Sequence, residues 1–411
     1  MITNFRINNC FVFSEPVDFT MLADMRIKKL ISNVHKCGDY NVLKSIGFYG
    51  PNNSGKTCLQ RSIVMMRNII LKKRFNLTSN YFTQNHVCTL GMDFLVDCKK
   101  YSYDFKYDER KHEFIYEKFS EISIDKYKNE LSNNIFVKDS ENDIYESNDR
   151  KLQDALPIAS KSNPLIHSLD TEKFDYLNQV KKLLENIASR IEFVDMNNIS
   201  MKHTINMLKH QDQNTDKLID FIKNADVALD NVYYADDEEF MRLIGNNKSI
   251  QEDIEKYDDF RLMSEYKGVK IPSMLADSEG TKKIAALASY IIESIEQGKI
   301  LLIDEIDSSF HFSLSRAIVA LFNNDVNSNS QLFFNTHDIS LLDTKRLMRK
   351  EQIWFVEKND KTTRLYSLKD FTANNDGIRD NSDIEEKYKM GQFGALPEPD
   401  LITHLLEDNY E

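Results

Sequence analysis

The sequence predicts an α/β fold with a mainly parallel central sheet, an antiparallel β lobe and a mostly helical insertion. Three observations point to this class. A glycine-rich segment at 50–57 lies between an apolar run and a helical pattern, two later apolar runs at 300–303 and 332–334 end in polar residues, and residues 93–119 alternate apolar and polar side chains. Strands buried on both faces read as continuous apolar runs, whereas half-buried antiparallel strands alternate.

The glycine-rich segment at 50–57 reads GPNNSGKT and fits the pattern G-x-x-x-x-G-K-[ST] at every fixed position. It follows the apolar run at 46–49 and precedes residues 58–70, whose apolar side chains recur at helical spacing. A strand, a loop and a helix in this order form a P-loop, in which backbone N–H groups and the helix N-terminus bind phosphate oxygens. The sequence therefore predicts a site for a nucleoside triphosphate with Mg²⁺.

Within this loop, we expect Lys56 to contact the β- and γ-phosphates and to take part in catalysis, and Thr57 to be a Mg²⁺ ligand. The groups expected to surround the phosphates come from nearly consecutive positions. They are Gly50, Asn52, Asn53, Ser54, Gly55, Lys56, Thr57 and Cys58. A P-loop by itself identifies a large superfamily, so the activity has to be inferred from residues elsewhere in the chain.

The composition limits the classes of function. With 411 residues, of which 41% are hydrophobic, the chain is long enough to bury a full core. No apolar run approaches the roughly 20 residues that span a bilayer, and the N-terminus lacks a signal-peptide pattern. We therefore expect a cytoplasmic protein that has no membrane partner. The net charge of −12 argues against a surface for unspecific DNA binding, but it leaves room for a local basic groove.

The cysteines give no sign of a metal or disulfide framework. The chain has five of them, Cys10, Cys37, Cys58, Cys88 and Cys98. Their number is odd and no two form a C-x-x-C pair, so the sequence indicates neither a zinc hook nor a disulfide framework. A reducing compartment is the expected setting.

A second group of candidate residues lies in the segment ILLIDE at 300–305. Its four apolar residues predict a buried strand, whose carboxyl end would present Asp304 and Glu305 at the ligand-binding edge of a parallel sheet. We expect Asp304 to hold Mg²⁺ through water or Thr57, and Glu305 to be the general base for the attacking water. Alone, the segment fits an ordinary core strand equally well; together with the P-loop, it favours catalysis.

Two further segments complete the set. Residues 275–288 form a polar turn that opens into an alanine-rich helical pattern, in which Ser278 caps the helix and Gly280 offers its N–H to an anion. Residues 332–338 predict a strand that brings His337 to the same edge of the sheet, where it would sense the γ-phosphate. A capped helix without a ligand and a histidine without a chemical role are the simpler alternatives.

The middle of the chain predicts a different kind of structure. The alternation at 93–119 indicates antiparallel strands, and the polar, asparagine-rich residues 120–155 indicate loops or a mobile linker. Beyond them, apolar residues recur with heptad spacing and then less regularly, as expected for a compact helical insertion. These residues are Leu177, Val180, Leu184, Ile187 and Ile191, followed by Leu208, Leu218, Phe221, Ala225 and Leu229.

Together these patterns predict three parts. Residues 1–119 form the N-terminal part of the nucleotide-binding head, 120–264 the helical insertion and 265–411 the C-terminal part of the head.

As an ordered set, the P-loop, SEGTK at 278–282, DE at 304–305, DSSFH at 307–311 and NTHD at 335–338 resemble the ABC-type ATPase heads of the SMC/Rad50 superfamily. More narrowly, they are similar to the AAA15 or OLD-like bacterial ATPases, which are often encoded in phage-defence and abortive-infection loci. The closing segment 388–397 also looks like the G-x-F-G-A-x-P motif of AAA15 proteins. The resemblance covers residues 1 to about 110 and 265–411.

The resemblance implies ATP and Mg²⁺ as cofactors. It also implies that Ser278 and Gly280 belong to the signature motif, which completes the ATP site of an opposing protomer. Residues 307–311 then match the D-loop, and His337 matches the switch histidine.

Two positions depart from the pattern of these heads. Glu279 stands where many ABC signatures carry glycine, so a carboxylate would lie beside the γ-phosphate. The glutamine that couples many ABC heads to their insertions is not evident, and Gln84 is the candidate.

The function that the resemblance implies is an ATP-hydrolysing switch. The switch would dimerise, or form a larger homo-oligomer, through its ATP sites and control a separate effector such as a nuclease or toxin in anti-phage defence. A phage protein or a nucleic acid would be the trigger. Because only about 70 residues follow His337, too few for the TOPRIM domain of OLD-like nucleases, we expect no nuclease in this chain.

Three other functions stay open at this point. The main alternative is a DNA-binding clamp in DNA repair, similar to Rad50 and SMC proteins. The others are the ATP-binding subunit of a transporter and a scaffold in which nucleotide stabilises an oligomer.

Overall fold

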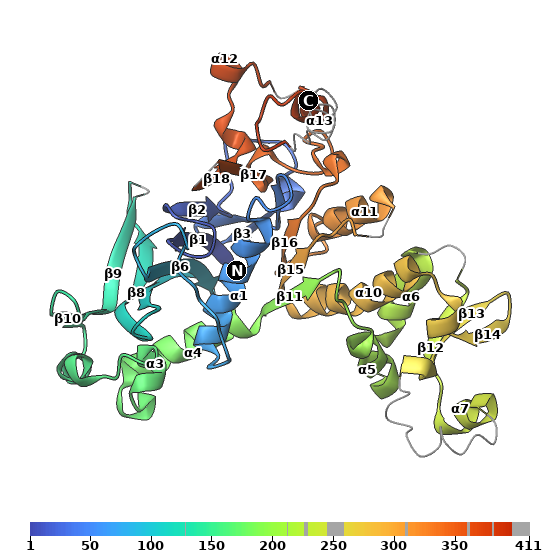
Figure 1. Cartoon of the computed structure of the whole chain (residues 1–411), viewed down its shortest axis with the longest axis horizontal. Helices are drawn as coiled ribbons and strands as arrows, with labels where there is room; N and C mark the ends of the chain where they lie inside the picture. Colours follow the sequence, from blue (N-terminus) through green and yellow to red (C-terminus); the bar gives the residue numbers. More distant parts are fainter. Residues whose placement is uncertain are drawn as a thin grey trace, which may run out of the picture. The chain divides into compact units, whose positions relative to one another are not determined.

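The computed structural model describes residues 1–127, 129–211, 213–225, 229–244, 259–308, 311–359, 362–379 and 382–396. The chain forms two compact units: Met1–Ser189 with Asn335–Glu411, and Arg190–Phe334. In the colour scale of Figure 1, the first unit runs from blue to green and resumes in orange and red. Residues 120–264, expected as one helical insertion, are divided between the two units. Within the described residues, none of the helices combines the length and apolar character needed to cross a membrane.

The first unit contains most of the strands. They are β1 (Ile2–Asn8), β2 (Val17–Thr20), β3 (Val34–Cys37), β4 (Tyr40–Leu43), β5 (Ser45–Tyr49), β6 (Val87–Val96), β7 (Lys99–Asp108), β8 (Glu113–Ile124), β9 (Glu130–Asp139), β10 (Ile144–Ser147), β17 (Ile353–Asn359) and β18 (Thr362–Ser367). Its α-helices are α1 (Lys56–Ile70), α2 (Arg150–Ala155), α3 (Leu165–Ser168), α4 (Asp175–Ser189), α12 (Ala373–Asp376) and α13 (Ile384–Lys389). Short 3₁₀ turns include η5 (Ile339–Leu341), η6 (Lys350–Gln352) and η7 (Leu368–Asp370).

The second unit carries fewer strands. They are β11 (Ile191–Asp195), β12 (Asn231–Tyr234), β13 (Leu262–Tyr266), β14 (Val269–Pro272), β15 (Ile300–Asp304) and β16 (Gln331–Asn335). Its helices are α5 (Lys202–His210), α6 (Thr215–Ala225), α7 (Asp237–Ile244), α9 (Ser273–Ala276), α10 (Glu279–Gln297) and α11 (Phe312–Phe322).

A seven-stranded antiparallel sheet, in the order β10-β9-β8-β7-β6-β1-β2, is the largest layer of the first unit. Its aromatic side chains alternate along the strands, and Phe94, Tyr103 and Phe105 are fully buried. The rings of Phe105 and Phe114 meet edge to face with centroids 5.4 Å apart, a geometry that aromatic pairs favour. The antiparallel lobe predicted at 93–119 is confirmed.

The prediction of loops or a linker at 120–155 is wrong. Strand β8 runs on to Ile124, β9 and β10 extend the sheet, and α2 begins at Arg150. Strand β9 lies near the sheet edge, and its first four residues are exposed. Only its second half is buried, around Phe136 and Val137. A strand that buries so few side chains lacks the alternation from which strands are recognised.

The strand and helix predicted around the glycine-rich loop are confirmed. Strand β5 is buried at all five positions and pairs in parallel with β17, which pairs in antiparallel fashion with β18. Helix α1 buries Leu59, Ile63 and Met66 on one side, at the expected helical spacing.

Helix α4 accounts for most of the heptad pattern. Leu177, Val180, Leu184 and Ile187 are all buried, and α4 packs against α1. The last position of the pattern was assigned wrongly, because α4 ends at Ser189 and Ile191 begins strand β11. Leu229 also lies outside a helix, since α6 ends at Ala225. An apolar residue at the right spacing does not reveal where the backbone changes from helix to strand.

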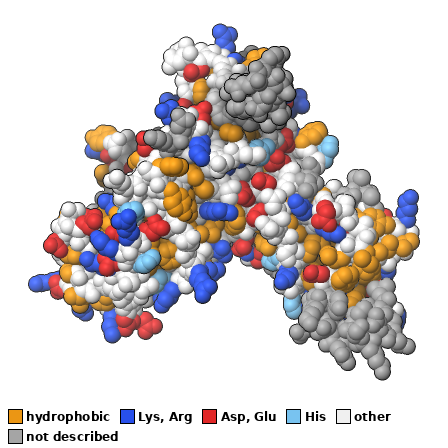
Figure 2. Space-filling model, viewed as in Figure 1, with side chains coloured by type: hydrophobic (Ala, Val, Ile, Leu, Met, Phe, Trp, Pro, Cys, Tyr) orange, Lys and Arg blue, Asp and Glu red, His pale blue; other side chains and the backbone are white. Residues whose placement is uncertain are grey.

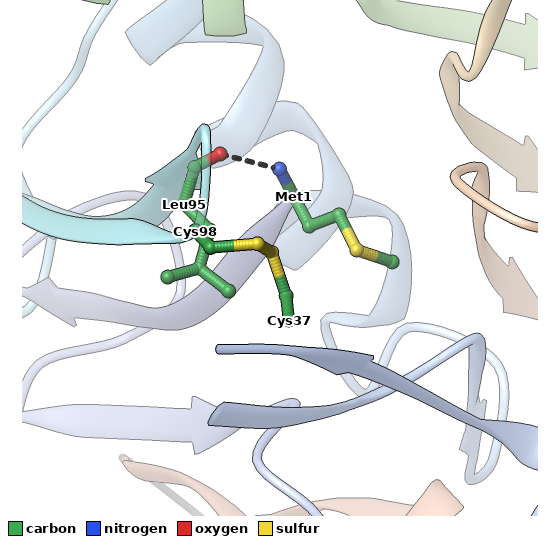
Figure 3. Close-up of a disulfide and its surroundings, with 4 residues drawn as sticks. All are labelled: Met1, Cys37, Leu95 and Cys98. Carbon is green, nitrogen blue, oxygen red and sulfur yellow. Dashed lines mark hydrogen bonds between the residues drawn. A yellow bond between two sulfur atoms is a disulfide. The ribbon is translucent and has the colours of Figure 1, made fainter. Parts of the chain in front are cut away.

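The structure contains a disulfide bond, although the cysteines gave no sign of a disulfide framework. Cys37, at the end of β3, is bonded to Cys98, in the turn between β6 and β7, and their Cα atoms lie 5.0 Å apart (Figure 3). The neighbouring Gly38 has a φ angle of 62°, a left-handed conformation that favours glycine in the turn after Cys37. The sequence shows no motif for this pair, because 61 positions separate the two cysteines and only the fold brings them together.

We expect Cys98→Ser to lower the free energy of unfolding by about 2–4 kcal/mol under oxidising conditions. The bond closes a loop of 61 residues, and such a cross-link reduces the conformational entropy of the unfolded chain. Urea unfolding with and without dithiothreitol measures the effect. The reductant should destabilise the wild type to the level of the variant and leave the variant unchanged. Equal stability of the wild type in both conditions would contradict the prediction.

The second unit contains a parallel group of strands, in which β15 pairs with β11 and with β16. Strand β15 is buried at all five positions, as the apolar run predicted. Strand β16 also occurs where the sequence placed it, and helix α11 precedes it in the chain. Helix α10 packs against α5 and α6, with Ala285 and Ala288 in the shared core.

A separate small sheet of the second unit has the order β12-β13-β14. It stands next to α9, which packs on both β13 and β14. Three apolar side chains of β14 and α9 are exposed: Val269 by 56%, Met274 by 40% and Leu275 by 71%. Figure 2 shows hydrophobic side chains gathered on the visible face of this region.

Candidate functional site

The glycine-rich loop of the first unit has the backbone of a phosphate-binding loop. It leaves β5 after Tyr49 and enters α1 at Lys56, whose N-cap is Gly55. Three residues have positive φ angles: Gly50 at 152°, Asn53 at 61° and Gly55 at 112°. These angles curl the chain so that the N-terminal end of α1, toward which the helix directs its backbone N–H groups, faces the loop.

The two glycines of the motif are required by their surroundings. A Cβ atom on Gly50 would overlap the carbonyl oxygen of Val356 in β17, and one on Gly55 would lie 2.7 Å from Val12 Cγ2. Both positions combine a positive φ angle with close packing, so a side chain at either one would displace the loop. The loop is therefore packed directly on strand β17.

A buried hydroxyl tests whether this loop suits an anion. Ser54 is 1% exposed, and among the described residues its Oγ has no hydrogen-bond partner. Thr363 is 2% exposed and its Oγ1 is likewise unpaired, and its methyl group lies 3.5 Å from a Cβ built on Gly55. Buried hydroxyls normally have partners. Two such hydroxyls at a phosphate-binding loop fit a site in which a bound phosphate becomes their hydrogen-bond partner.

The other predicted residues lie at the start of the loop, at its tip and in the first turn of α1. Lys56 is 7% exposed, and its Nζ donates hydrogen bonds to the carbonyl oxygens of Gly50, at 2.7 Å, and Pro51, at 2.9 Å. Its ammonium group therefore lies against the start of the loop. Thr57 and Cys58 are half-buried in the first turn of α1. Asn52 and Asn53 are exposed at the tip.

His337 belongs to the first unit and lies just beyond the end of β16. The N–H of the preceding residue, Thr336, donates to the carbonyl oxygen of Phe48 in β5, at 3.3 Å. Phe48 lies two positions before Gly50 in the chain, so this hydrogen bond brings the backbone next to His337 close to the start of the loop. The first unit thus brings the predicted switch histidine, which is exposed, to the same end of β5 as the P-loop.

Asp304 and Glu305 lie at the C-terminal end of β15 in the second unit. Asp304 is 8% exposed, and it pairs across the parallel ladder with Asp195 of β11. Glu305 follows with a φ angle of 58°, a left-handed conformation that costs a non-glycine residue free energy. Strained backbone of this kind is concentrated at functional sites, which agrees with the catalytic role predicted for this carboxylate.

Asn197 is a functional candidate that the sequence interpretation missed. Its Nδ2 donates to Glu305 Oε2 at 2.9 Å, and its Oδ1 accepts a hydrogen bond from Ser308 Oγ at 3.3 Å. Lys283 Nζ of α10 donates to the same Ser308 hydroxyl at 3.1 Å. These contacts hold the carboxylate of Glu305 in one orientation. The signal available in the sequence was the acidic residue Asp195 at the end of strand β11. The strand is hard to recognise, because the heptad pattern of the preceding helix continues to Ile191.

Ser278 forms the N-cap of α10, and its Oγ accepts a hydrogen bond from Thr281 N at 3.1 Å. The capping part of the prediction is therefore confirmed. Ser278 is exposed and Gly280 is half-buried in the first turn of α10, so both are accessible from outside the unit. The neighbouring Glu279 is exposed too, with its carboxylate 3.1 Å from Lys282 Nζ.

Asp277, the residue before this N-cap, is hydrogen-bonded to strand β13 of the small sheet. Asp277 is 9% exposed, and its two carboxylate oxygens accept hydrogen bonds from Ser264 Oγ and Tyr266 Oη, each at 2.7 Å. Both donors belong to β13. Ser264 also exchanges a hydrogen bond with Ser273 Oγ of α9, at 2.6 Å. A displacement of β13 would therefore act on the turn that carries Ser278.

Two predicted features remain, Gln84 and the D-loop. Gln84 is exposed in the loop before β6. Of the D-loop at 307–311, Asp307 and Ser308 lie before the start of α11, while 309 and 310 lie outside the described residues. Among the described residues, Gln84 forms no hydrogen bond or ion pair with the predicted site residues, whereas Asn197 contacts the predicted base.

The closing motif at 388–397 packs on strands β17 and β18, with residue 397 outside the described part. Phe393 stacks on Phe355 with centroids 5.5 Å apart, and its carbonyl oxygen accepts a hydrogen bond from Tyr366 Oη at 2.7 Å. Tyr388 Oη donates to Ala395 O at 2.7 Å. The motif therefore anchors the chain to β17, the strand on which Gly50 rests.

Comparison with known proteins gives one family. Residues 45–343 match the family described as "AAA domain, putative AbiEii toxin, Type IV TA system". Among solved structures, the SMC head domain from Thermotoga maritima is 10% identical, with a TM-score of 0.43 over 89% of this chain and 98% of that one. The SmcHead bound to the C-winged helix domain of ScpA is 11% identical, with a TM-score of 0.39 over 89% and 97%. No curated protein matches the chain.

Proposed function

The chain belongs to this family of AAA domains, which its residues 45–343 match, and on this premise we propose that it is an ATP-hydrolysing switch that controls a partner protein. The observation that carries the proposal is the phosphate-binding loop. Its backbone is curled by Gly50 and Gly55, its Lys56 ammonium group lies against it, and the buried hydroxyl of its own Ser54 lacks a partner among the described residues. Such a loop is built for the phosphates of a nucleotide.

The roles of the residues follow from their chemistry. Lys56 would neutralise the β- and γ-phosphates, and Thr57 with Asp304 would hold Mg²⁺, which prefers oxygen ligands and keeps several waters. Glu305, oriented by Asn197, would accept a proton from the attacking water, and His337 would contact the γ-phosphate.

We assign Ser278 and Gly280 to the ATP site of a second copy of the chain. Support comes from their exposure at the start of α10, a helix of 19 residues whose N-terminus attracts anions. ATP would then hold two copies together, and hydrolysis would release them. The link from Asp277 to β13 would transmit this change to the small sheet of the second unit.

The small sheet is where we place the effector. Val269, Met274 and Leu275 are exposed beside the signature turn, and exposed apolar side chains in a group mark protein interaction sites. The family description names a toxin of a toxin–antitoxin system, which supports a defence role such as abortive infection. The effector itself would be a separate toxin or nuclease.

Mixing two inactive variants tests the shared ATP site. Lys56→Ala removes the phosphate contact, and Ser278→Arg blocks the signature turn, so each variant alone should lose ATPase activity and ATP-dependent self-association. In a mixed dimer, both changes fall in one of the two sites and the other site is intact. Random mixing in equal amounts should restore about a quarter of the wild-type ATPase rate.

Ser162→Arg, at an exposed serine of the first unit, is the matched control and should keep full activity. The proposal of a shared site fails if Ser278→Arg hydrolyses ATP like the wild type, or if the mixture stays inactive while both variants bind each other.

A further inference from the structure

We propose that the first unit binds single-stranded nucleic acid through its phosphates, in a groove separate from the P-loop. The groove consists of two adjoining hollows of about 460 and 680 Å³. Segment 24–30, η6, η7 and the segment 371–379 form its walls, and we call it the basic groove. This site goes beyond the proposed ATP switch and does not depend on ATP.

The charge of the groove is opposite to that of the whole chain. Seven of the residues that line its two hollows are lysine or arginine, and Asp24 is the one acidic residue among them. The whole chain carries a net charge of −12. A concave surface lined by one sign of charge concentrates the potential and raises the local concentration of the opposite ion. The expected ligand is therefore a polyanion.

A buried ion pair builds the wall of the groove. Arg349 is 2% exposed; its guanidinium donates to Glu351 Oε1 at 2.7 Å and to the carbonyl oxygens of Asp24, at 2.9 Å, and Lys29, at 2.7 Å. These bonds fix the backbone that carries Arg26 and Lys28. A preformed wall of this kind lowers the entropy cost of binding a ligand.

The acidic residue of the groove is already neutralised. The carboxylate of Asp24 lies 2.7 Å from Arg26 Nη2 and 3.4 Å from Lys369 Nζ. It therefore adds little repulsion toward an anion. Lys28 and Arg379, in contrast, are exposed and line different hollows of the groove, where their long side chains can reach phosphates.

The form of the groove favours a nucleic acid strand over an acidic peptide. The two hollows share five lining residues, so together they form one continuous depression with room for more than one phosphate. Phe371 also lines it and is only half-buried, so its ring can stack on a base. A peptide carboxylate would use the same cations but would gain nothing from this aromatic ring.

Anisotropy of a fluorescein-labelled oligothymidylate or oligouridylate of about 20 nucleotides measures the binding. The full chain should bind with a strong salt dependence between about 50 and 200 mM NaCl. The variant Lys28→Gln/Arg379→Gln should bind on the order of tenfold more weakly and show a shallower slope against salt, because two phosphate contacts are lost. The two oligonucleotides distinguish RNA from DNA as the source of the phosphates.

Lys151→Gln/Lys182→Gln is the matched control, since it removes the same charge at exposed positions of the first unit outside the groove. It should bind like the wild type. Equal loss in both variants, or no binding by the wild type, would overturn the proposal. The proposal would also fail if polyglutamate displaced the labelled oligonucleotide as effectively as unlabelled oligonucleotide does. Repeating the titration with Lys56→Ala separates this result from the ATP switch, because that variant should keep the groove intact.

Discussion

Replacing Glu305 by glutamine is expected to slow ATP hydrolysis by about 10³-fold while ATP stays bound. Glutamine has nearly the same shape, and its side-chain oxygen can still accept the hydrogen bond that Asn197 Nδ2 donates to Glu305 Oε2 at 2.9 Å. Only the ability to take a proton from the attacking water is lost. Single-turnover hydrolysis of radiolabelled ATP, together with filter binding, measures both quantities.

Asn197→Ala is the comparison that separates the base from the residue that orients it. Because Asn197 positions the carboxylate without taking up a proton itself, its loss should lower kcat by about tenfold and leave ATP affinity unchanged. Asn197→Gln should recover part of the rate. If Glu305→Gln hydrolyses ATP at the wild-type rate, Glu305 is not the general base and the carboxylate that takes this role lies elsewhere.

Gly50→Ala is expected to weaken ATP binding by at least about 100-fold without unfolding the protein. A methyl group at this position would overlap the carbonyl oxygen of Val356, and this backbone atom belongs to the paired strand β17 and cannot move away. The loop has to shift instead, so its N–H groups no longer point at the phosphates. Titration with a fluorescent ATP analogue measures the affinity, and thermal unfolding checks the fold.

Gly377→Ala is a suitable control because Gly377 also has a positive φ angle, 68°, but a Cβ there would meet no atom within 4 Å. It carries the same kind of backbone strain without the clash, so ATP affinity should be that of the wild type. Normal ATP binding by Gly50→Ala would show that the packing of the loop on β17 is not needed for the site.

The fold class was predictable because its strongest signals are local. Strand β15 is buried at all five positions and therefore appears as an apolar run, and helix α1 shows its buried face at regular spacing. Strands β9 and β10 were missed for the opposite reason, since most of their side chains are exposed or half-buried. Ile191 was placed in a helix because its spacing continued the pattern of α4 by one step.

The candidate site likewise contains residues that the sequence could identify and residues that it could not. The positions of the phosphate-binding loop could be identified because its donors are nearly consecutive and two glycines mark the curl. Asn197 could not be identified, because 108 positions separate it from Glu305 and an asparagine in a polar turn carries no signal of its own. The disulfide between Cys37 and Cys98 was missed for the same reason, because 61 positions separate the two cysteines.

By itself, the sequence determined the phosphate-binding loop, the order of the motifs and the α/β class, because these depend on residues that are close together in the chain. Tertiary structure alone decided what each of those residues touches. It set Gly50 against β17, oriented Glu305 through Asn197 and gathered the cations of the basic groove from segments more than 300 positions apart. Contacts of this kind depend on how the strands and helices pack, and packing joins residues whose spacing in the sequence follows no fixed period.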